Sequence, residues 1–165
     1  MNITLSTKER YLLEDEKSHE ELCIKKYREY AGQASDPQLK DIFNNHANIE
    51  QEHLNTLNQL LNGQVPALNN QQGGNQQQQQ QQPQQMQANS AQMQGASSNY
   101  NQKDKELCTD MLMTEKYVSS TYNTAIFEFR DPNVRDVLNH IQKEEQKHGE
   151  AIFKYMESKG MYTLQ

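Results

Sequence analysis

The sequence contains no long hydrophobic run, and this absence limits the classes to which the protein can belong. Hydrophobic residues make up only 33% of the 165 residues, and the mean hydropathy is −1.09. Because a membrane helix needs a run of about 18 or more apolar residues, we expect no membrane span. Residues 1–20 carry several charged side chains and no apolar stretch of the kind that signal peptides contain, so we also expect no secretory signal.

Cysteine and positive charge are scarce as well. The chain has two cysteines, Cys23 and Cys108, which form no Cys-x-x-Cys pair, so a disulfide-rich secreted scaffold is excluded and both are expected to be small core residues. The 16 basic residues are outnumbered by 22 acidic ones, for a net charge of −6. Such a balance does not suit the phosphate backbone, so we expect no nucleic-acid partner.

One long internal segment has no charged residues at all. Residues 63–101 contain no Asp, Glu, Lys or Arg, and they include an uninterrupted glutamine run from Gln76 to Gln82. Such a composition cannot bury enough apolar surface to offset the entropy of ordering the chain, which predicts a Gln-rich disordered linker. Glutamine tracts also associate as β-structure, so a role in self-association is an open alternative.

The segments on either side of this linker resemble each other. A shift of 95 residues aligns them without a gap, and the matched pairs include Glu20 with Glu115, Tyr27 with Tyr122, Asp36-Pro37 with Asp131-Pro132, Glu50 with Glu145 and His53 with His148. This register predicts a duplicated unit of about 55 residues.

Each repeated unit is predicted to be a helical hairpin. Asp36 and Asp131 suit helix N-caps, and the proline after each of them suits the first helical position. Gly63 and Gly160 stand where a C-terminal glycine is expected. The four predicted helices cover about residues 7–34, 37–62, 102–129 and 132–159. The chain thereby divides into a first hairpin, a linker and a second hairpin at residues 1–62, 63–101 and 102–165.

Apolar residues recur at spacings of three and four along the predicted helices, as in Val134, Val137, Leu138 and Ile141. Amphipathic helices of this length bury such stripes against one another. We therefore predict an all-α protein in which the two hairpins form one ferritin-like four-helix bundle, with the linker as a long crossover.

Charged residues interrupt the apolar stripes at matching places. Glu20, for example, lies seven residues from both Leu13 and Tyr27 and so shares their helix face. Six residues are expected to face the core in this way, namely Glu20, Glu50, His53, Glu115, Glu145 and His148. Because a buried carboxylate is costly unless it is paired or binds a metal, these six are candidate metal ligands.

The candidates also lie at matched heights in the two hairpins. Glu20 and Glu50 are each fifteen residues from Ser35 at the first turn, and the corresponding residues of the second hairpin are spaced equally about Arg130. Each half thus supplies one glutamate and one Glu-x-x-His motif. Four carboxylates and two imidazoles form the ligand set of di-iron and di-manganese bundles, so the sequence predicts a dinuclear Fe or Mn site.

Two other interpretations of these residues stay open. A single Glu-x-x-His motif on a charged helix usually lies on a solvent-exposed face. If the six residues are buried, they can also hydrogen-bond only to one another and bind no metal. Tyr27 and Tyr122 are expected to be core aromatics with bonded hydroxyls rather than redox residues. His46 is expected in or beside the core, and His19 and His140 on the surface.

Several segments of the second hairpin together resemble a known family. They are Lys105–Asp110, Thr114–Thr124, Asp131–Arg135, Lys143–His148 and Tyr155–Tyr162. Through them, residues 102–162 resemble the Coat F domain of endospore-forming bacteria, a ferritin-like helical unit. Residues 7–61 look like the N-terminal half of related spore coat proteins.

The resemblance implies a structural protein of the spore coat that is made in the mother-cell cytoplasm. Its implied partners are other coat proteins, and a homo-oligomer is open. The resemblance implies no known reaction, and no catalytic residue carries over from it. The predicted ligand set makes a metal-dependent oxidase or a peroxide-consuming enzyme the alternative. We favour the coat role, with metal binding as a second hypothesis.

Overall fold

The structure is a computed structural model that describes residues 2–67 and 100–163. Within these residues it contains four α-helices, which are α1 (Thr7–Gln33), α2 (Pro37–Leu61), α3 (Gln102–Glu128) and α4 (Pro132–Ser158). The predicted all-α class is confirmed, and each helix ends one residue before its predicted end. Most of the predicted Gln-rich linker, residues 68–99, lies outside the described residues.

Each helix begins at a side chain that satisfies its free backbone N–H groups. Asp36 and Asp131 cap α2 and α4 as predicted, and each is followed by a proline in the first turn. Asn101 caps α3. At the start of α1, the Ser6 hydroxyl accepts from the Glu9 backbone N–H while the Glu9 carboxylate accepts from the Ser6 backbone N–H, which is a capping box.

Gly63 and Gly160 end α2 and α4 in the left-handed conformation, with φ of +77° and +71°. After α2, the Gly63 N–H donates to the Leu60 carbonyl and the Gln64 N–H donates to the Gln59 carbonyl. This pair of bonds is a Schellman motif, and the same pair recurs at Gly160. The predicted helix-terminating role of both glycines is therefore confirmed.

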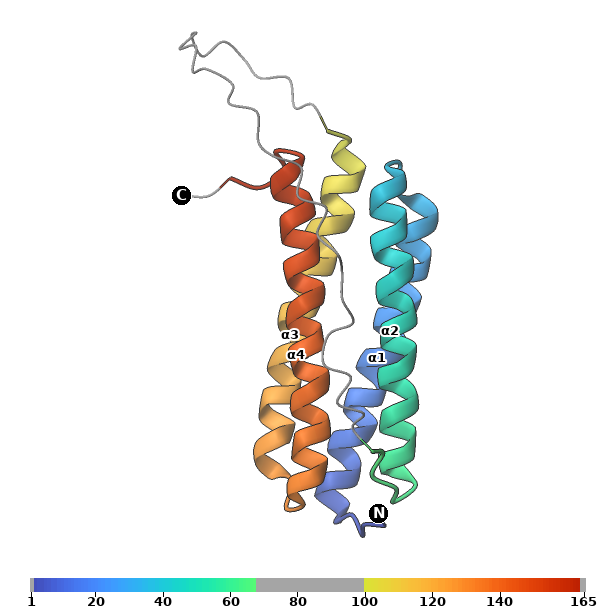
Figure 1. The fold of residues 1–165 in the computed structure, drawn as a ribbon, viewed down its shortest axis with the longest axis vertical. Helices are drawn as coiled ribbons and strands as arrows, with labels where there is room; N and C mark the ends of the chain where they lie inside the picture. The colour runs from blue at the N-terminus through green and yellow to red at the C-terminus, as the bar shows by residue number, and fades with distance from the viewer. Residues whose placement is uncertain (1, 68–99, 164–165) are drawn as a thin grey trace, which may run out of the picture.

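The helices are arranged as two antiparallel hairpins packed side by side (Figure 1). The α1–α2 and α3–α4 contacts form the hairpins, and the α1–α3 and α2–α4 contacts join them. α2 ends at the opposite end of the bundle from the start of α3 (Figure 1). None of these described helices is apolar and long enough to cross a bilayer.

The apolar stripes fill the interior in two clusters. One surrounds Tyr27, Phe43 and Ile152, and the other surrounds Tyr122 and Ile141. Cys23 and Cys108 are buried and unbonded members of these clusters, as predicted. On α2, α3 and α4 the predicted ligands lie where the helix passes from one cluster to the other, so the core has a polar layer at mid-height.

Each hairpin binds the turn of the other through a buried carboxylate at the start of a helix. The Arg130 N–H donates to Glu9 Oε1 at 3.0 Å, and its guanidinium donates to Glu9 Oε2 at 3.2 Å. The Ser35 N–H donates to Asp104 Oδ1 at 2.8 Å, and its hydroxyl donates to Asp104 Oδ2 at 2.6 Å. Both partners of the second pair stand 95 residues from those of the first, so the two ends of the bundle are closed in equivalent ways.

Candidate metal centre

The structure brings all six predicted ligands together in the middle of the bundle, where each is at most 3% exposed. Their ligand atoms form two groups, and within each group the atoms lie within 4.8 Å of one another. The first group is Glu20, Glu50, His53 and Glu145, and the second is Glu50, Glu115, Glu145 and His148. Glu50 and Glu145 belong to both groups, so the six residues form one continuous cluster.

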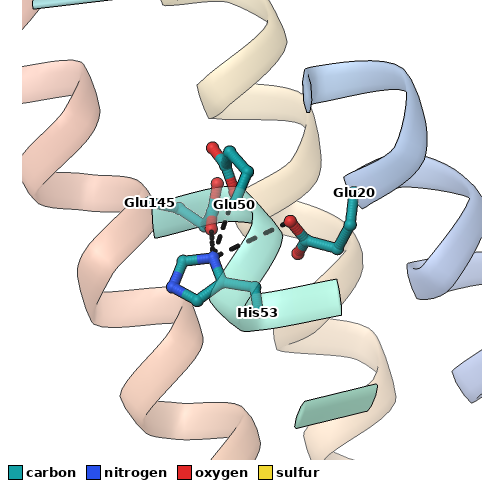
Figure 2. Close-up of side chains that lie close together, drawn as sticks. All are labelled: Glu20, Glu50, His53 and Glu145. Atoms are coloured by element: carbon teal, nitrogen blue, oxygen red, sulfur yellow. Dashed lines mark hydrogen bonds and ion pairs between the residues drawn. The ribbon is translucent and has the colours of Figure 1, made fainter. Parts of the chain in front are cut away.

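The first group is centred on the Nδ1 atom of His53 (Figure 2). This nitrogen lies 3.0 Å from Glu50 Oε2 and 2.9 Å from Glu145 Oε1. Glu20 Oε2 is 3.7 Å away. Carboxylates from α1, α2 and α4 therefore converge on one imidazole nitrogen.

The second group is arranged around His148 in a similar way. Its Nδ1 atom lies 3.0 Å from Glu50 Oε1 and 3.9 Å from Glu115 Oε1. The two oxygens of Glu50 thus face different histidines, because the other oxygen approaches His53. Glu50 links the two groups, which is the role of a shared carboxylate.

Two tyrosines hydrogen-bond to the outer glutamates of the cluster, Glu20 and Glu115, which each belong to only one ligand group. The Tyr27 hydroxyl donates to Glu115, and the Tyr122 hydroxyl donates to Glu20. Burial raises the pKa of both tyrosines, and the nearby carboxylates raise it further, so both hydroxyls stay protonated as donors. The predicted bonded hydroxyls are confirmed.

Several buried polar atoms of the cluster have no hydrogen-bond partner in the described part of the chain. They are Glu20 Oε2, Glu115 Oε2, both carboxyl oxygens of Glu145 and His148 Nε2. The close approach of Glu145 to His53 is an ion-pair distance without hydrogen-bond geometry. An unsatisfied buried polar atom costs about 1–3 kcal/mol, so a chain that needed only a stable core would gain by replacing these groups.

Burial raises the pKa of three of the four carboxyl groups. The pKa of Glu145 rises to about 8 through burial and the negative charge of Glu50, and those of Glu50 and Glu115 also rise well above normal, chiefly through burial. Burial also acts to raise the pKa of Glu20, but the neighbouring His53 outweighs it, so that pKa falls. The metal-free cluster therefore holds protons that a bound cation would displace.

Glu144 is a residue of the candidate site that the sequence reasoning missed. Its Oε2 lies 2.8 Å from Nε2 of His53, the ring nitrogen that points away from the cluster. A carboxylate on that nitrogen fixes the orientation of a ligating imidazole. Burial would lower the pKa of His53, but the surrounding carboxylates of Glu144, Glu145, Glu20 and Glu50 raise it. The sequence offered one signal for this role, because Glu144 is an acidic residue directly before Glu145.

The remaining histidines lie at three different depths. His46 is buried and stacks on His148 with ring centroids 4.2 Å apart, as expected for a histidine beside the site. Burial, with a smaller effect of His148, lowers the pKa of His46 to about 3. His140 is exposed as predicted, with 52% of its side chain accessible. His19 is half-buried, because it contacts the buried Glu16 at 3.2 Å.

Comparison with known protein families identifies the second hairpin. Residues 103–165 match the family model of the Coat F domain. The second hairpin is a Coat F domain. The resemblance predicted for this hairpin is thereby confirmed, and the Coat F domain contains three of the six candidate ligands, Glu115, Glu145 and His148. No curated protein and no solved structure matches the chain. The similarity of residues 7–61 to other coat proteins stays a prediction.

Proposed function

We propose that the chain is a structural protein of the endospore coat whose helical bundle binds two divalent metal ions, either Fe or Mn. The Coat F domain supports the coat role. The observation that carries the metal proposal is the membership of Glu50 and Glu145 in both ligand groups. Each group is completed by one further glutamate and one histidine, so neither hairpin holds a complete set alone.

The residues fit such a centre in their chemistry as well as their placement. Carboxylate and imidazole donors suit Fe and Mn. Four carboxylates offset the charge of two divalent cations, which removes the main cost of burying acidic groups together. Oxygens of Glu20, Glu115 and Glu145 are almost completely buried and have no hydrogen-bond partner among the described residues. These are the atoms that a metal ion would bind.

The roles of the residues follow from their positions. Glu50 and Glu145 would be shared between the ions, with Glu20 and His53 on one side and Glu115 and His148 on the other. Tyr27 and Tyr122 orient the two outer glutamates, and Glu144 orients His53. Bound metal ions of this type supply Lewis-acid and redox chemistry.

Metal content is the test of the metal proposal. Elemental analysis of the full chain, purified without chelator, is expected to find about two Fe or Mn per chain. The Glu50→Ala/Glu145→Ala variant is expected to hold none, whereas a control with two exposed carboxylates removed, Glu14→Ala/Glu21→Ala, keeps the wild-type content. A wild-type chain that takes up neither Fe(II) nor Mn(II) overturns this part of the proposal.

The coat role has its own test. A tagged full chain should be recovered in the coat extract of purified spores and should cross-link there to other coat proteins or to further copies of itself. Recovery only from the mother-cell lysate, with no signal in the coat fraction, contradicts the coat role whatever the metal content.

A metal-dependent oxidoreductase is the second candidate function. The observation that favours it is a pocket between α3 and α4 whose lining includes Glu115 and Glu145. Consumption of peroxide or oxygen by the metal-loaded chain, lost in the Glu50→Ala/Glu145→Ala variant, would support it. A loaded chain that consumes neither contradicts this candidate and leaves the coat role in place.

A further inference from the structure

The two halves of the candidate metal centre match in the residues that face its middle. One half is completed by Glu20 and His53, and the other by Glu115 and His148. In each half the imidazole Nδ1 lies 3.0 Å from an oxygen of Glu50. The glutamate that completes each half accepts a hydrogen bond from a tyrosine of the other hairpin. A difference between the halves therefore has to come from residues further out.

The outer nitrogens of the two histidines have different surroundings. Nε2 of His53 lies 2.8 Å from Oε2 of Glu144. Nε2 of His148 is buried and has no hydrogen-bond partner among the described residues. The His148 ring instead stacks on His46, whose Nδ1 is also buried without such a partner. One imidazole is thus held by a carboxylate and the other by ring stacking.

This difference follows from the residue types at two positions of the repeat. In the register of 95 residues, Glu144 corresponds to Ile49, and His46 corresponds to Ile141. In each pair a polar side chain of one hairpin is matched by an apolar side chain of the other. Neither outer contact is therefore repeated in the opposite half, although the six candidate ligands are.

A carboxylate on the outer nitrogen strengthens an imidazole as a ligand. It fixes the orientation of the ring and raises the basicity of the nitrogen that faces the metal, and loss of such a partner lowers metal affinity by about 10–100-fold. Stacking holds the plane of the His148 ring but leaves its Nε2 without a hydrogen bond. His53 is therefore the better supported of the two imidazoles.

We propose that the two metal positions are unequal, that the half completed by Glu20 and His53 binds the first divalent cation, and that Glu144 is the positioning residue that sets this order. This inference rests on the proposed metal function. It adds the order in which the two halves are filled and the contact that determines it.

Variants that disable one half at a time test the order of filling. Glu20→Gln and Glu115→Gln each remove one ligand charge and keep a side-chain oxygen for the tyrosine hydroxyl. Calorimetric titration of the chelator-treated full chain with Mn(II) should find one ion at the first wild-type affinity in Glu115→Gln. The ion left in Glu20→Gln should bind about tenfold or more weakly. The two variants are needed because neighbouring cations repel, so that even identical halves would fill with unequal affinities.

The role of Glu144 is tested in the same two backgrounds. Glu144→Gln should lower the Mn(II) affinity by about 10–100-fold in Glu115→Gln and leave it unchanged in Glu20→Gln. A general loss of stability would instead weaken both. The matched control is Glu52→Gln, at an exposed residue that lines the same pocket as Glu144 and His53, and it should change neither affinity. This control separates contact with the His53 ring from loss of nearby negative charge.

Equal Mn(II) affinities of Glu20→Gln and Glu115→Gln overturn this inference and leave the metal proposal in place. Equal losses from Glu144→Gln in both backgrounds do the same. A wild-type chain that takes up neither Mn(II) nor Fe(II) overturns the metal proposal and this inference with it. If circular dichroism shows that a glutamine variant does not fold, Glu20→Asp and Glu115→Asp take the place of the pair, with the same expected ranking.

Discussion

Tyr27 on α1 donates a hydrogen bond to Glu115 on α3, so an aromatic residue of the first hairpin fixes a carboxylate of the second. Tyr122 of the second hairpin likewise donates a hydrogen bond to Glu20 of the first. Because each hairpin orients a glutamate of the other, the cluster is complete only when the hairpins are docked. Packing of the bundle and assembly of the candidate metal centre are therefore one event.

Removing one of these hydroxyls should weaken metal binding without unfolding the bundle. Tyr27→Phe keeps the ring in the core and deletes only the donor to Glu115. Loss of such an outer partner lowers metal affinity by about 10–100-fold. Competition with a chelator of known affinity for Mn(II) measures the change. Tyr117→Phe, at a residue that is 60% exposed, is the control, and an unchanged affinity in Tyr27→Phe would contradict the orienting role.

Replacing a cluster carboxylate by an apolar residue should stabilise the metal-free chain. Glu145 is fully buried with both oxygens unpartnered, and His53 keeps Glu50 and Glu144 when it is removed. For Glu145→Met we expect a gain of about 1–3 kcal/mol in the free energy of unfolding. Each kcal/mol should raise the thermal midpoint by about 2–4 °C. Thermal unfolding in chelator measures it.

The same variant separates metal binding from the interpretation in which the six residues only bond to one another. Added Mn(II) should raise the midpoint of wild type but not that of Glu145→Met, because a ligand stabilises only the state that binds it. A midpoint of metal-free Glu145→Met below that of wild type would instead favour mutual hydrogen bonding as the purpose of the cluster.

Sequence alone predicts those features of the fold that depend on residues close together in the chain. Helix starts at Asp36 and Asp131 and ends at Gly63 and Gly160 depend on neighbouring backbone groups, so their positions were predicted within a residue or confirmed outright. The burial of the six candidate ligands was also predicted, because helical spacing alone places them on the core faces, whereas their role as ligands stays a prediction.

Features that depend on which helix lies beside which were not accessible in this way. Glu144 reaches His53 only because α2 and α4 are neighbours. Spacing assigned His19 to the surface, but its contact with Glu16 leaves it half-buried. The pocket beside Gly149 was not accessible either, because residues of both α3 and α4 line it.

The Glu9–Arg130 contact should make stability depend on pH in the acidic range. Burial acts to raise the pKa of Glu9, but hydrogen bonds from Arg130 and Ser6 outweigh it and lower the pKa to about 2. A lowered carboxyl pKa contributes stability that is present above the unfolded value near 4.5 and is lost as the pH falls towards 2. Glu9→Gln should therefore destabilise the protein at neutral pH but not near pH 2.

Denaturant unfolding across this pH range measures the difference between wild type and Glu9→Gln. We expect about 1–2 kcal/mol at neutral pH, because the guanidinium of Arg130 is largely exposed and solvent screens part of its charge. Glu14→Gln, at an exposed position of the same helix, should show no such pH-dependent difference. A difference for Glu9→Gln that persists unchanged to pH 2 would rule out ionisation of Glu9 as its cause.

One substitution made at three glycines should give three different results. Gly160→Ala places an L-residue in the left-handed region and should cost about 1 kcal/mol. Gly63→Ala should cost more, because its Cβ would also lie 2.9 Å from the Ile3 carbonyl oxygen. Gly149→Ala has ordinary contacts inside a helix and should instead stabilise by about 0.5–1 kcal/mol. Thermal midpoints should rank Gly149→Ala above wild type, then Gly160→Ala, then Gly63→Ala. A midpoint for Gly149→Ala below wild type would mean that packing against Leu112 and Glu115 requires this glycine.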